Sequence, residues 1–238
     1  MKRREFLSSM AAFGAASAIP LTNAAEISGG QPWQPGQVSL PPGLPRKGGL
    51  QFFTRHQLET VGAIAERFIP ADELSISGKE AGCATFIDRQ LAGDFGHAVT
   101  VYRLGRFVKG TPEQGPQSPL TPADQYRLGL SALDNYCQQQ FSHNFTELTG
   151  DQQDQVLRGM ETGKISLTEG FDSKVFFELL LQNVREGFLS DPLYGGNKDM
   201  ASWKMIGFPG ARYDFRDVIA KKGQKLNIIP TSLIDNTL

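Results

Sequence analysis

Cysteine is scarce in this chain of 238 residues: only Cys83 and Cys137 are present, and 54 positions separate them. A four-cysteine iron–sulfur cluster or zinc site needs more thiolate ligands than the sequence contains. The C-x-x-C-H pattern that attaches haem covalently is also absent. The chain is therefore not expected to hold such a centre on its own cysteines.

Histidine is almost as scarce. The three that are present, His56, His97 and His143, never fall three or four positions apart, so no single helix turn would present two of them to a metal. Each is interpreted as a surface or hydrogen-bonded residue. Glycine-rich signatures for dinucleotides or phosphates and the G-x-S-x-G nucleophile motif are missing as well. We therefore expect no metal and no cofactor in this chain.

The sequence also lacks an excess of one charge. Its 24 basic and 25 acidic residues give a formal net charge of −1. Such a balance provides no electrostatic footprint for nucleic acid, so no nucleic-acid partner is expected. After the first residues, no stretch reaches the roughly 18 apolar residues of a transmembrane helix. The mature chain should therefore be soluble or peripherally attached to a membrane.

The beginning of the chain has a distinct pattern. Residues 1–24, "MKRREFLSSMAAFGAASAIPLTNA", join a basic start to a short, weakly apolar, alanine-rich stretch that predicts a cleavable leader. The pattern matches the twin-arginine signal and predicts export to the periplasm; an ordinary secretory signal is the alternative. The twin-arginine route carries proteins that have already folded, commonly around a cofactor. The residues that match this signal are Arg3, Arg4, Phe6 and Leu7.

Residues 25–53 form a segment rich in proline and glycine. Five prolines and six glycines lie between positions 26 and 50. Such a segment cannot bury enough apolar surface to offset its ordering entropy by itself. We predict an extended strap, with Trp33 docked either on the protein's own body or on a partner. The rest of the chain, 54–238, is predicted to be one helical domain.

From Thr54 onward, apolar residues recur with the period of an α-helix and predict an all-α protein, a single irregular bundle of about six helices. Thr54 with Gln57 forms a capping box, and Thr121 before Pro122 marks another helix start. A long loop is expected after the last helix. The segments predicted to be helical are 54–70, 83–91, 94–108, 121–141, 149–163 and 172–188, the third being weakened by β-branched residues.

The two cysteines fall on the inward faces of their predicted helices. Two buried thiols that act as small apolar residues are one interpretation. A disulfide between Cys83 and Cys137 is a second, worth about 4 kcal/mol by loop entropy in an oxidising compartment. A bridge from one of them to another chain is the third.

The most distinctive stretch is residues 190–215, "SDPLYGGNKDMASWKMIGFPGARYDF", with four glycines, two prolines and five aromatics in 26 residues. Residues 191–217 closely resemble the signature of the gluconate 2-dehydrogenase subunit 3 family: Tyr-Gly-Gly-Asn-x-Asp, then Trp-Lys, then Gly-Phe-Pro-Gly-Ala. The resemblance includes the leader and the segments "LTPADQYRLGLSALDNYC", "DQQDQVLRGMETG" and "FFELLLQNVREGFLSDP". It covers the chain from Thr54 to about Pro230.

The resemblance implies a non-catalytic small subunit of a periplasmic dehydrogenase of sugars or sugar acids. The flavin, FAD, would lie in a large glucose–methanol–choline-type flavoprotein subunit that has no signal of its own. This chain would bind and stabilise that subunit in the cytoplasm, and the twin-arginine translocase would export the folded pair. A membrane-anchored cytochrome c subunit with haem c would take the electrons to the quinone pool. The protein would then be attached to the membrane only peripherally, through the complex.

The 190–215 loop is the candidate contact with that partner. Its glycines permit close backbone approach, and its aromatics offer rigid contact area. The alternative is a loop wrapped on its own bundle, with the aromatics in the core. Asn197 and Asp199 are candidates for substrate contact if the loop borders the flavin cleft. The residues expected on the partner surface are Tyr194, Gly195, Gly196, Trp203, Phe208, Pro209 and Arg212.

Two other functions stay open. One is a stand-alone periplasmic enzyme whose site is assembled from distant residues such as His97, Asp199 and Glu186. The other is a periplasmic binding or scaffold protein unrelated to redox chemistry, with the strap as its interaction arm. Flavin in a co-purified partner would separate the accessory subunit from both.

Overall fold

The computed structural model describes residues 49–103, 105–114, 117–212 and 214–233. The predicted leader, with Arg3, Arg4, Phe6 and Leu7, lies outside the described residues. So does the predicted strap up to residue 48, including Trp33.

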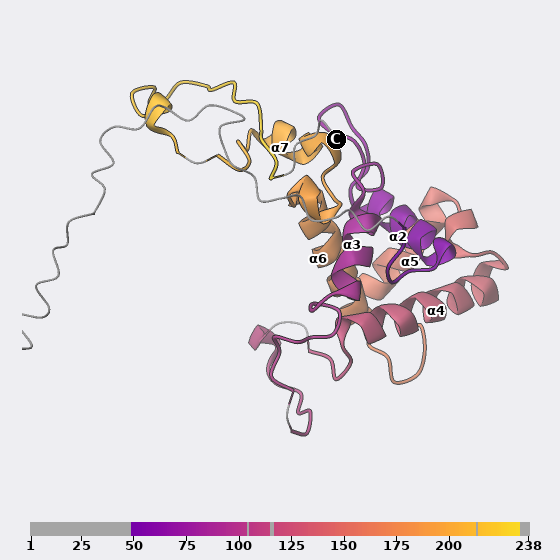
Figure 1. The fold of residues 1–238 in the computed structure, drawn as a ribbon. Coiled ribbons are helices and arrows are strands. Elements are labelled where there is room, and N and C mark those ends of the chain that lie inside the picture. The colour runs from indigo at the N-terminus through magenta and orange to yellow at the C-terminus, as the bar shows by residue number, and fades with distance from the viewer. Residues whose placement is uncertain (1–48, 104, 115–116, 213, 234–238) are drawn as a thin grey trace, which may run out of the picture.

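The described ranges contain six α-helices and no β-strand, which confirms the predicted all-α fold (Figure 1). None of the helices in these ranges is long and apolar enough to cross a membrane. Short 3₁₀ turns connect the elements. The α-helices are α2 (Arg55–Phe68), α3 (Cys83–Ala92), α4 (Pro122–Phe141), α5 (Gly150–Glu161), α6 (Ser173–Leu189) and α7 (Ala201–Ile206).

The helix starts follow from local capping. At α2, the Thr54 side chain accepts a hydrogen bond from the Gln57 backbone, and the Gln57 side chain accepts one from the Thr54 backbone. Thr149 and Gln152 repeat this capping box at α5. The Thr121 side chain caps α4, with Pro122 at its first position. These caps satisfy backbone N–H groups that a helix start leaves without partners.

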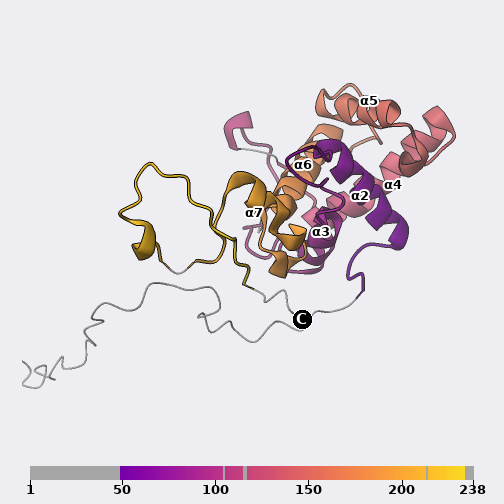
Figure 2. The ribbon, with the colours of Figure 1, turned by 90° about the horizontal axis from the view of Figure 1, so that it is seen from above.

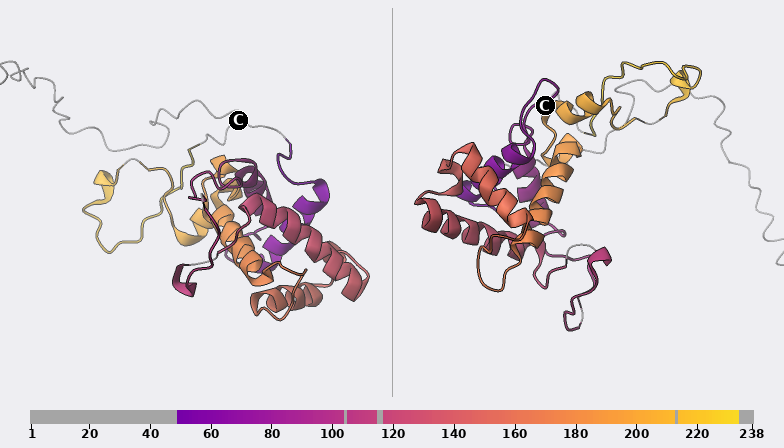
Figure 3. Two further views of the ribbon diagram at one scale, coloured as in Figure 1. Left: turned by 90° about the horizontal axis from the view of Figure 1, so that it is seen from below. Right: turned by 180° about the vertical axis from the view of Figure 1, so that it is seen from behind.

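Helix α6 is the centre of the bundle and contacts each of the other five α-helices (Figures 2 and 3). Phe176, Leu180 and Val184 are fully buried on it. The Tyr126 ring of α4 packs edge-on against Phe176 at 5.6 Å between centroids. The Asn183 side-chain amide donates to the Tyr126 hydroxyl at 3.0 Å. Because α6 holds the core together, its C-terminal end is a rigid base for whatever follows it.

The prediction of a helix over 94–108 is wrong. This segment forms turns that project from the body (Figures 1 and 3). Gly96 lies so close to α3 that a Cβ there would be 1.9 Å from the Leu91 carbonyl oxygen, and Ala98 has a φ of 52°. The β-branched residues 99–101 add a further bias against helix. The count of six is still right because α7 forms inside the stretch that was predicted to be a loop.

Candidate interaction surface

Residues 190–210, called here the docked loop, continue directly from the C-terminal end of α6. They contain two 3₁₀ turns, η3 (Pro192–Tyr194) and η4 (Lys198–Met200), and then α7. Pro192 follows Asp191, whose side chain caps η3 by accepting from the Leu193 backbone N–H at 2.8 Å. The loop is therefore ordered by local turns before it contacts the bundle.

The side chain of Asn197 holds the docked loop together by hydrogen bonds within the loop. It is completely buried and adopts a left-handed φ of 45°. Its Oδ1 accepts hydrogen bonds from the Ser202 N–H at 3.0 Å and from the Ser202 hydroxyl at 2.8 Å. Its Nδ2 donates to the Ser190 carbonyl at 2.8 Å. Asn197 thus holds the loop closed from inside. Because it is buried, it is not positioned for the substrate contact that the sequence had suggested.

Backbone close approaches fix the docked loop to α3 and α6. The Lys198 N–H donates to the Ala81 carbonyl at 3.0 Å, just before α3. A Cβ on Gly82 would lie 2.8 Å from the Gly195 carbonyl oxygen, and one on Gly196 would lie 2.0 Å from the Gly187 oxygen. Only glycine lets the chains meet at these distances. Gly195 and Gly196 therefore hold the loop to its own bundle.

Trp203 belongs to the interior of the docked loop. Only 6% of the residue is exposed, and its indole N–H donates to the Leu189 carbonyl at 2.8 Å, at the end of α6. Its ring packs edge-on against Phe208, with centroids 5.1 Å apart. Trp203 is thus covered within the chain, and a contact between it and a partner stays a prediction. The indole finds both its apolar contact and its hydrogen-bond partner inside the chain.

The chain leaves the docked loop at residues 209–211 and returns to it at residue 231. These two segments are bonded to each other and form a narrow neck. The Thr231 N–H donates to the Pro209 carbonyl, and the Ala211 N–H donates back to the Thr231 carbonyl at 2.7 Å. The Asp191 carboxylate accepts from the Ser232 hydroxyl at 2.7 Å and from the Leu233 N–H at 2.9 Å. Residues 211–230, called here the arm, therefore form a closed excursion that extends away from the helices (Figures 1 and 2).

Arg212 serves the arm internally. Its guanidinium donates to the Asp214 carbonyl at 2.6 Å and pairs with the Asp217 carboxylate, and it lies over the Phe215 ring. Hydrogen bonding to Arg212 holds the pKa of Asp217 below its usual value. Only 5% of the Arg212 side chain is exposed. The Arg212 guanidinium is therefore engaged within the arm, and its contact with a partner stays a prediction.

The docked loop does expose apolar side chains. Tyr194 and Phe208 are 46% and 45% exposed, which agrees with a place on a contact surface. Met205 and Ile206 of α7, 40% and 56% exposed, join them. Pro209 is half-buried at the neck. Met205 and Ile206 were not among the expected contact residues because α7 was not predicted. A helix over 201–206 would have been needed to place both side chains outward.

A hollow of about 650 Å³ lies along the outer face of α6 and ends where the docked loop begins. Gln182 donates to Glu186 across one turn at 2.8 Å. The hollow therefore combines charged and apolar groups along one face of α6. Among the described residues it is lined by Glu178, Leu181, Gln182, Arg185, Glu186 and Leu189.

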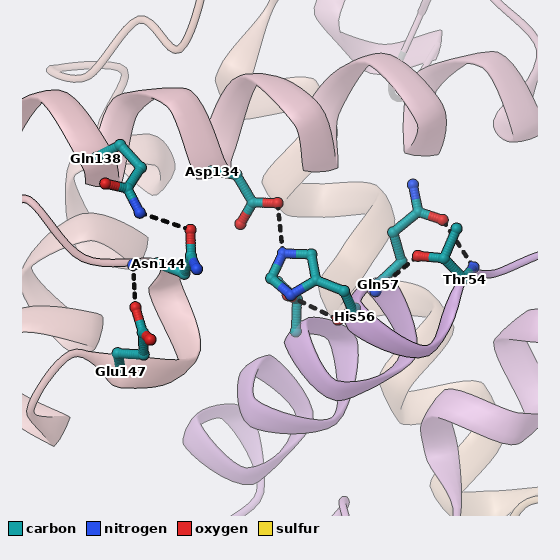
Figure 4. A network of polar contacts seen from close by, with 8 residues as sticks. Thr54, His56, Gln57, Asp134, Gln138, Asn144 and Glu147 are labelled. Carbon is teal, nitrogen blue, oxygen red and sulfur yellow. Dashed lines mark hydrogen bonds and ion pairs between the residues drawn. The ribbon is translucent and has the colours of Figure 1, made fainter.

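The histidines take structural or surface positions. His56 Nε2 lies 2.7 Å from the Asp134 carboxylate and links α2 to α4 (Figure 4). His143 contacts the Phe141 carbonyl at the end of α4. His97, Asp199 and Glu186 are all exposed, and no hydrogen bond or ion pair joins them in the part of the chain that the structure describes.

Cys83 and Cys137 are separate free thiols in the structure, and both are buried. Removal from water disfavours the thiolate and raises the pKa of each to about 12. The disulfide alternative is therefore not what the structure shows. No group of three or more potential metal ligands occurs among the described residues.

Comparison with known proteins identifies the family of this chain. Neither the search of curated proteins nor the search of solved structures found a match. A family model described as gluconate 2-dehydrogenase subunit 3 matches residues 55–210. The match runs from the first residue of α2 to Gly210 at the neck, so it includes the bundle and the docked loop but not the arm. This chain belongs to the gluconate 2-dehydrogenase subunit 3 family.

Proposed function

We propose that this protein is the non-catalytic small subunit that binds and stabilises the large flavoprotein of a gluconate 2-dehydrogenase-type complex. The family name supports a role as a subunit of that assembly. The substrate, a sugar or sugar acid, would be oxidised in the partner, a glucose–methanol–choline-type subunit that holds FAD.

The observation that carries this proposal is the apolar surface of the docked loop. Its backbone is held by Asn197, by the glycine contacts and by the Trp203 hydrogen bond. A surface that is rigid before binding loses little entropy when a partner covers it. Full burial of an apolar side chain contributes about 1.5–3 kcal/mol, so covering a half-exposed Ile206 or Phe208 contributes about 1 kcal/mol.

The remaining parts of the proposal concern the path of the complex. The leader would send the folded pair through the twin-arginine translocase to the periplasm. A membrane-anchored cytochrome c subunit with haem c would accept the electrons. The export role would suit this assembly because the twin-arginine route carries folded proteins. The partner would supply the bound cofactor.

Purification of the C-terminally tagged chain from the periplasm of its native host tests the proposal. We expect a large yellow subunit to co-purify, with a flavin absorbance spectrum and gluconate-dependent reduction of a dye. A colourless chain without a large partner would refute the accessory-subunit function.

A paired set of variants tests the surface itself. Met205→Ser with Ile206→Ser should weaken complex formation about tenfold or more, because two apolar contacts are lost while the loop's internal bonds remain. Leu74→Ser with Leu128→Ser is the matched control, since both leucines are exposed elsewhere on the body. Equal affinity of the two double variants would assign the contact to another surface.

A further inference from the structure

A second exposed apolar surface lies far from the docked loop in the chain, in the turns between α3 and α4. Residues 97–111, called here the turn loop, carry five large apolar side chains that face solvent. Tyr102 is 82% exposed and Val108 is 78% exposed, values at which almost none of the side chain contacts the protein. The five residues are Val99, Val101, Tyr102, Phe107 and Val108.

The turn loop is also basic. Arg103, Arg106 and Lys109 are all exposed and lie among the apolar residues. Glu113 is the only acidic residue between positions 97 and 122. The turn loop itself has these three basic residues and no acidic one, a net charge of +3 within a chain whose net charge is −1.

A closed base makes the turn loop project as a unit. The Ala123 N–H donates to the Gly96 carbonyl at 3.1 Å. This bond joins the first turn of α4 to the residue that directly precedes the turn loop. The Arg103 guanidinium donates to the Pro119 carbonyl. The Gln117 side chain bonds the backbone of Gly110 and Thr111. Figure 1 and the right panel of Figure 3 show this segment extending below the helices, whereas the arm extends from their upper end.

We propose that the turn loop inserts its apolar side chains into the surface of an anionic lipid bilayer. Aromatic and branched apolar residues enter the boundary between headgroups and acyl chains, and neighbouring Arg and Lys meet the lipid phosphates. Tyr102 has the amphipathic ring that is enriched at that depth. Such a surface accommodates both the exposed apolar side chains and the positive charge of Arg106 and Lys109.

The contrast with the docked loop favours lipid over a second protein. The docked loop is shaped by buried hydrogen bonds and glycine contacts, as recognition of a defined protein surface requires. Apart from Ala98, the residues of the turn loop whose burial the structure describes are all exposed. A fluid bilayer accepts apolar side chains without a matching shape. The inference is independent of the proposed function, because it needs no flavoprotein.

Sedimentation with lipid vesicles tests the inference. The chain is purified from the periplasm and its mass is measured, so that the leader does not contribute to binding. We expect it to bind 3:1 phosphatidylcholine–phosphatidylglycerol vesicles, to bind pure phosphatidylcholine more weakly, and to be released by salt. Arg106→Glu with Lys109→Glu should reduce the partition coefficient more than tenfold. Tyr102→Ser with Val108→Ser should reduce it similarly.

Two controls make the result specific to this loop. Lys221→Glu with Lys222→Glu makes the same charge change on the arm and should leave vesicle binding unchanged. Because both native cysteines are buried, a Thr100→Cys variant can be labelled at one position with a polarity-sensitive dye, whose emission should shift to the blue on anionic vesicles. Absence of binding, or equal binding by the loop variants and wild type, would overturn the inference. So would loop variants that keep vesicle binding but lose the flavoprotein, since the loop would then be a protein interface.

Discussion

At the scale of single residues, burial decides the chemistry of the polar groups in this protein. Asp88 is 2% exposed, yet its carboxylate accepts three backbone N–H groups, those of Gln51, Phe52 and Phe53, at 2.8–2.9 Å. Asn197 is fully buried and bonded through both side-chain atoms. Buried polar groups with partners cost little, whereas an amide without partners would cost about 1–3 kcal/mol and a carboxylate without partners more. Each of these side chains therefore fixes a particular segment in place.

The cysteine thiols provide the prediction at this scale. In the native protein at pH 8, Cys83 and Cys137 should not react with a thiol reagent such as DTNB, because both are buried and the pKa of each is about 12. In denaturant without reductant, two thiols per chain should react. Detection of none in denaturant would show an internal disulfide, and a cross-linked dimer or complex on a non-reducing gel would show a bridge to another chain.

At the scale of elements, the docked loop is positioned by contacts with segments distant in the sequence. Its backbone meets the start of α3 at Ala81 and Gly82, and the end of α6 at Gly187 and Leu189. α3 and α6 pack against each other in the bundle. The loop therefore spans two elements that are already held rigidly, and its exposed residues gain their fixed positions from that base.

Gly82 is the element-scale test of this docking. Gly82→Ala places a Cβ 2.8 Å from the Gly195 oxygen at a φ of 82°, so it should displace the loop. Gly163→Ala is the matched control, because its φ of 68° brings a similar backbone strain of about 1 kcal/mol with nothing within 4 Å. In a Trp33→Phe background, fluorescence reports Trp203 alone, as the chain has two tryptophans. We expect a red shift for Gly82→Ala only; identical spectra for both would mean that the loop docks without this contact.

At the scale of the whole molecule, a few ion pairs join helices that are distant in the chain. Arg67 of α2 donates two hydrogen bonds to Asp154 of α5, at 2.7 and 2.8 Å. The hydrogen bond from Arg67 holds the pKa of Asp154 below its usual value of 3.8. Because the pKa is lower in the folded state, the pair adds stability above pH 3.8 that is lost as the pH falls through the folded value.

Asp154→Asn should therefore lower the free energy of unfolding by about 1 kcal/mol at pH 7, a modest value because both side chains are partly exposed. The difference from wild type should shrink as the pH falls below about 4. Urea unfolding measured from pH 7 to pH 3 checks this. Glu161→Gln, at the exposed end of α5, removes a charge without this partner and should change little. If the free energies of unfolding of wild type and Asp154→Asn differed by the same amount at every pH, the pH-dependent contribution assigned to the Arg67–Asp154 pair would be contradicted.

Capping explains which helices sequence reasoning recovered. The Thr54–Gln57 and Thr121–Pro122 signals lie within four residues of the helix starts they create. The predicted bounds of α2 and α4 are therefore close to the observed ones. The same reasoning failed for 94–108, where the close contact of Gly96 with α3 decided the backbone. It also missed α7, whose six residues are held in the loop by the Trp203 bond to α6.

The sequence by itself determined the all-α class, the starts of α2, α4 and α5 and the family, because periodicity, capping and a spaced motif are all properties of neighbouring residues. Only the tertiary structure decided which side chains of the 190–215 stretch face inward. Trp203, Asn197 and Arg212 are buried by partners within the folded chain, while Met205 and Ile206 are left outside. The physical reason is that the loop lies against the start of α3 and the end of α6, where Lys198 bonds Ala81 and Trp203 bonds Leu189, and these two helices meet only in the folded bundle.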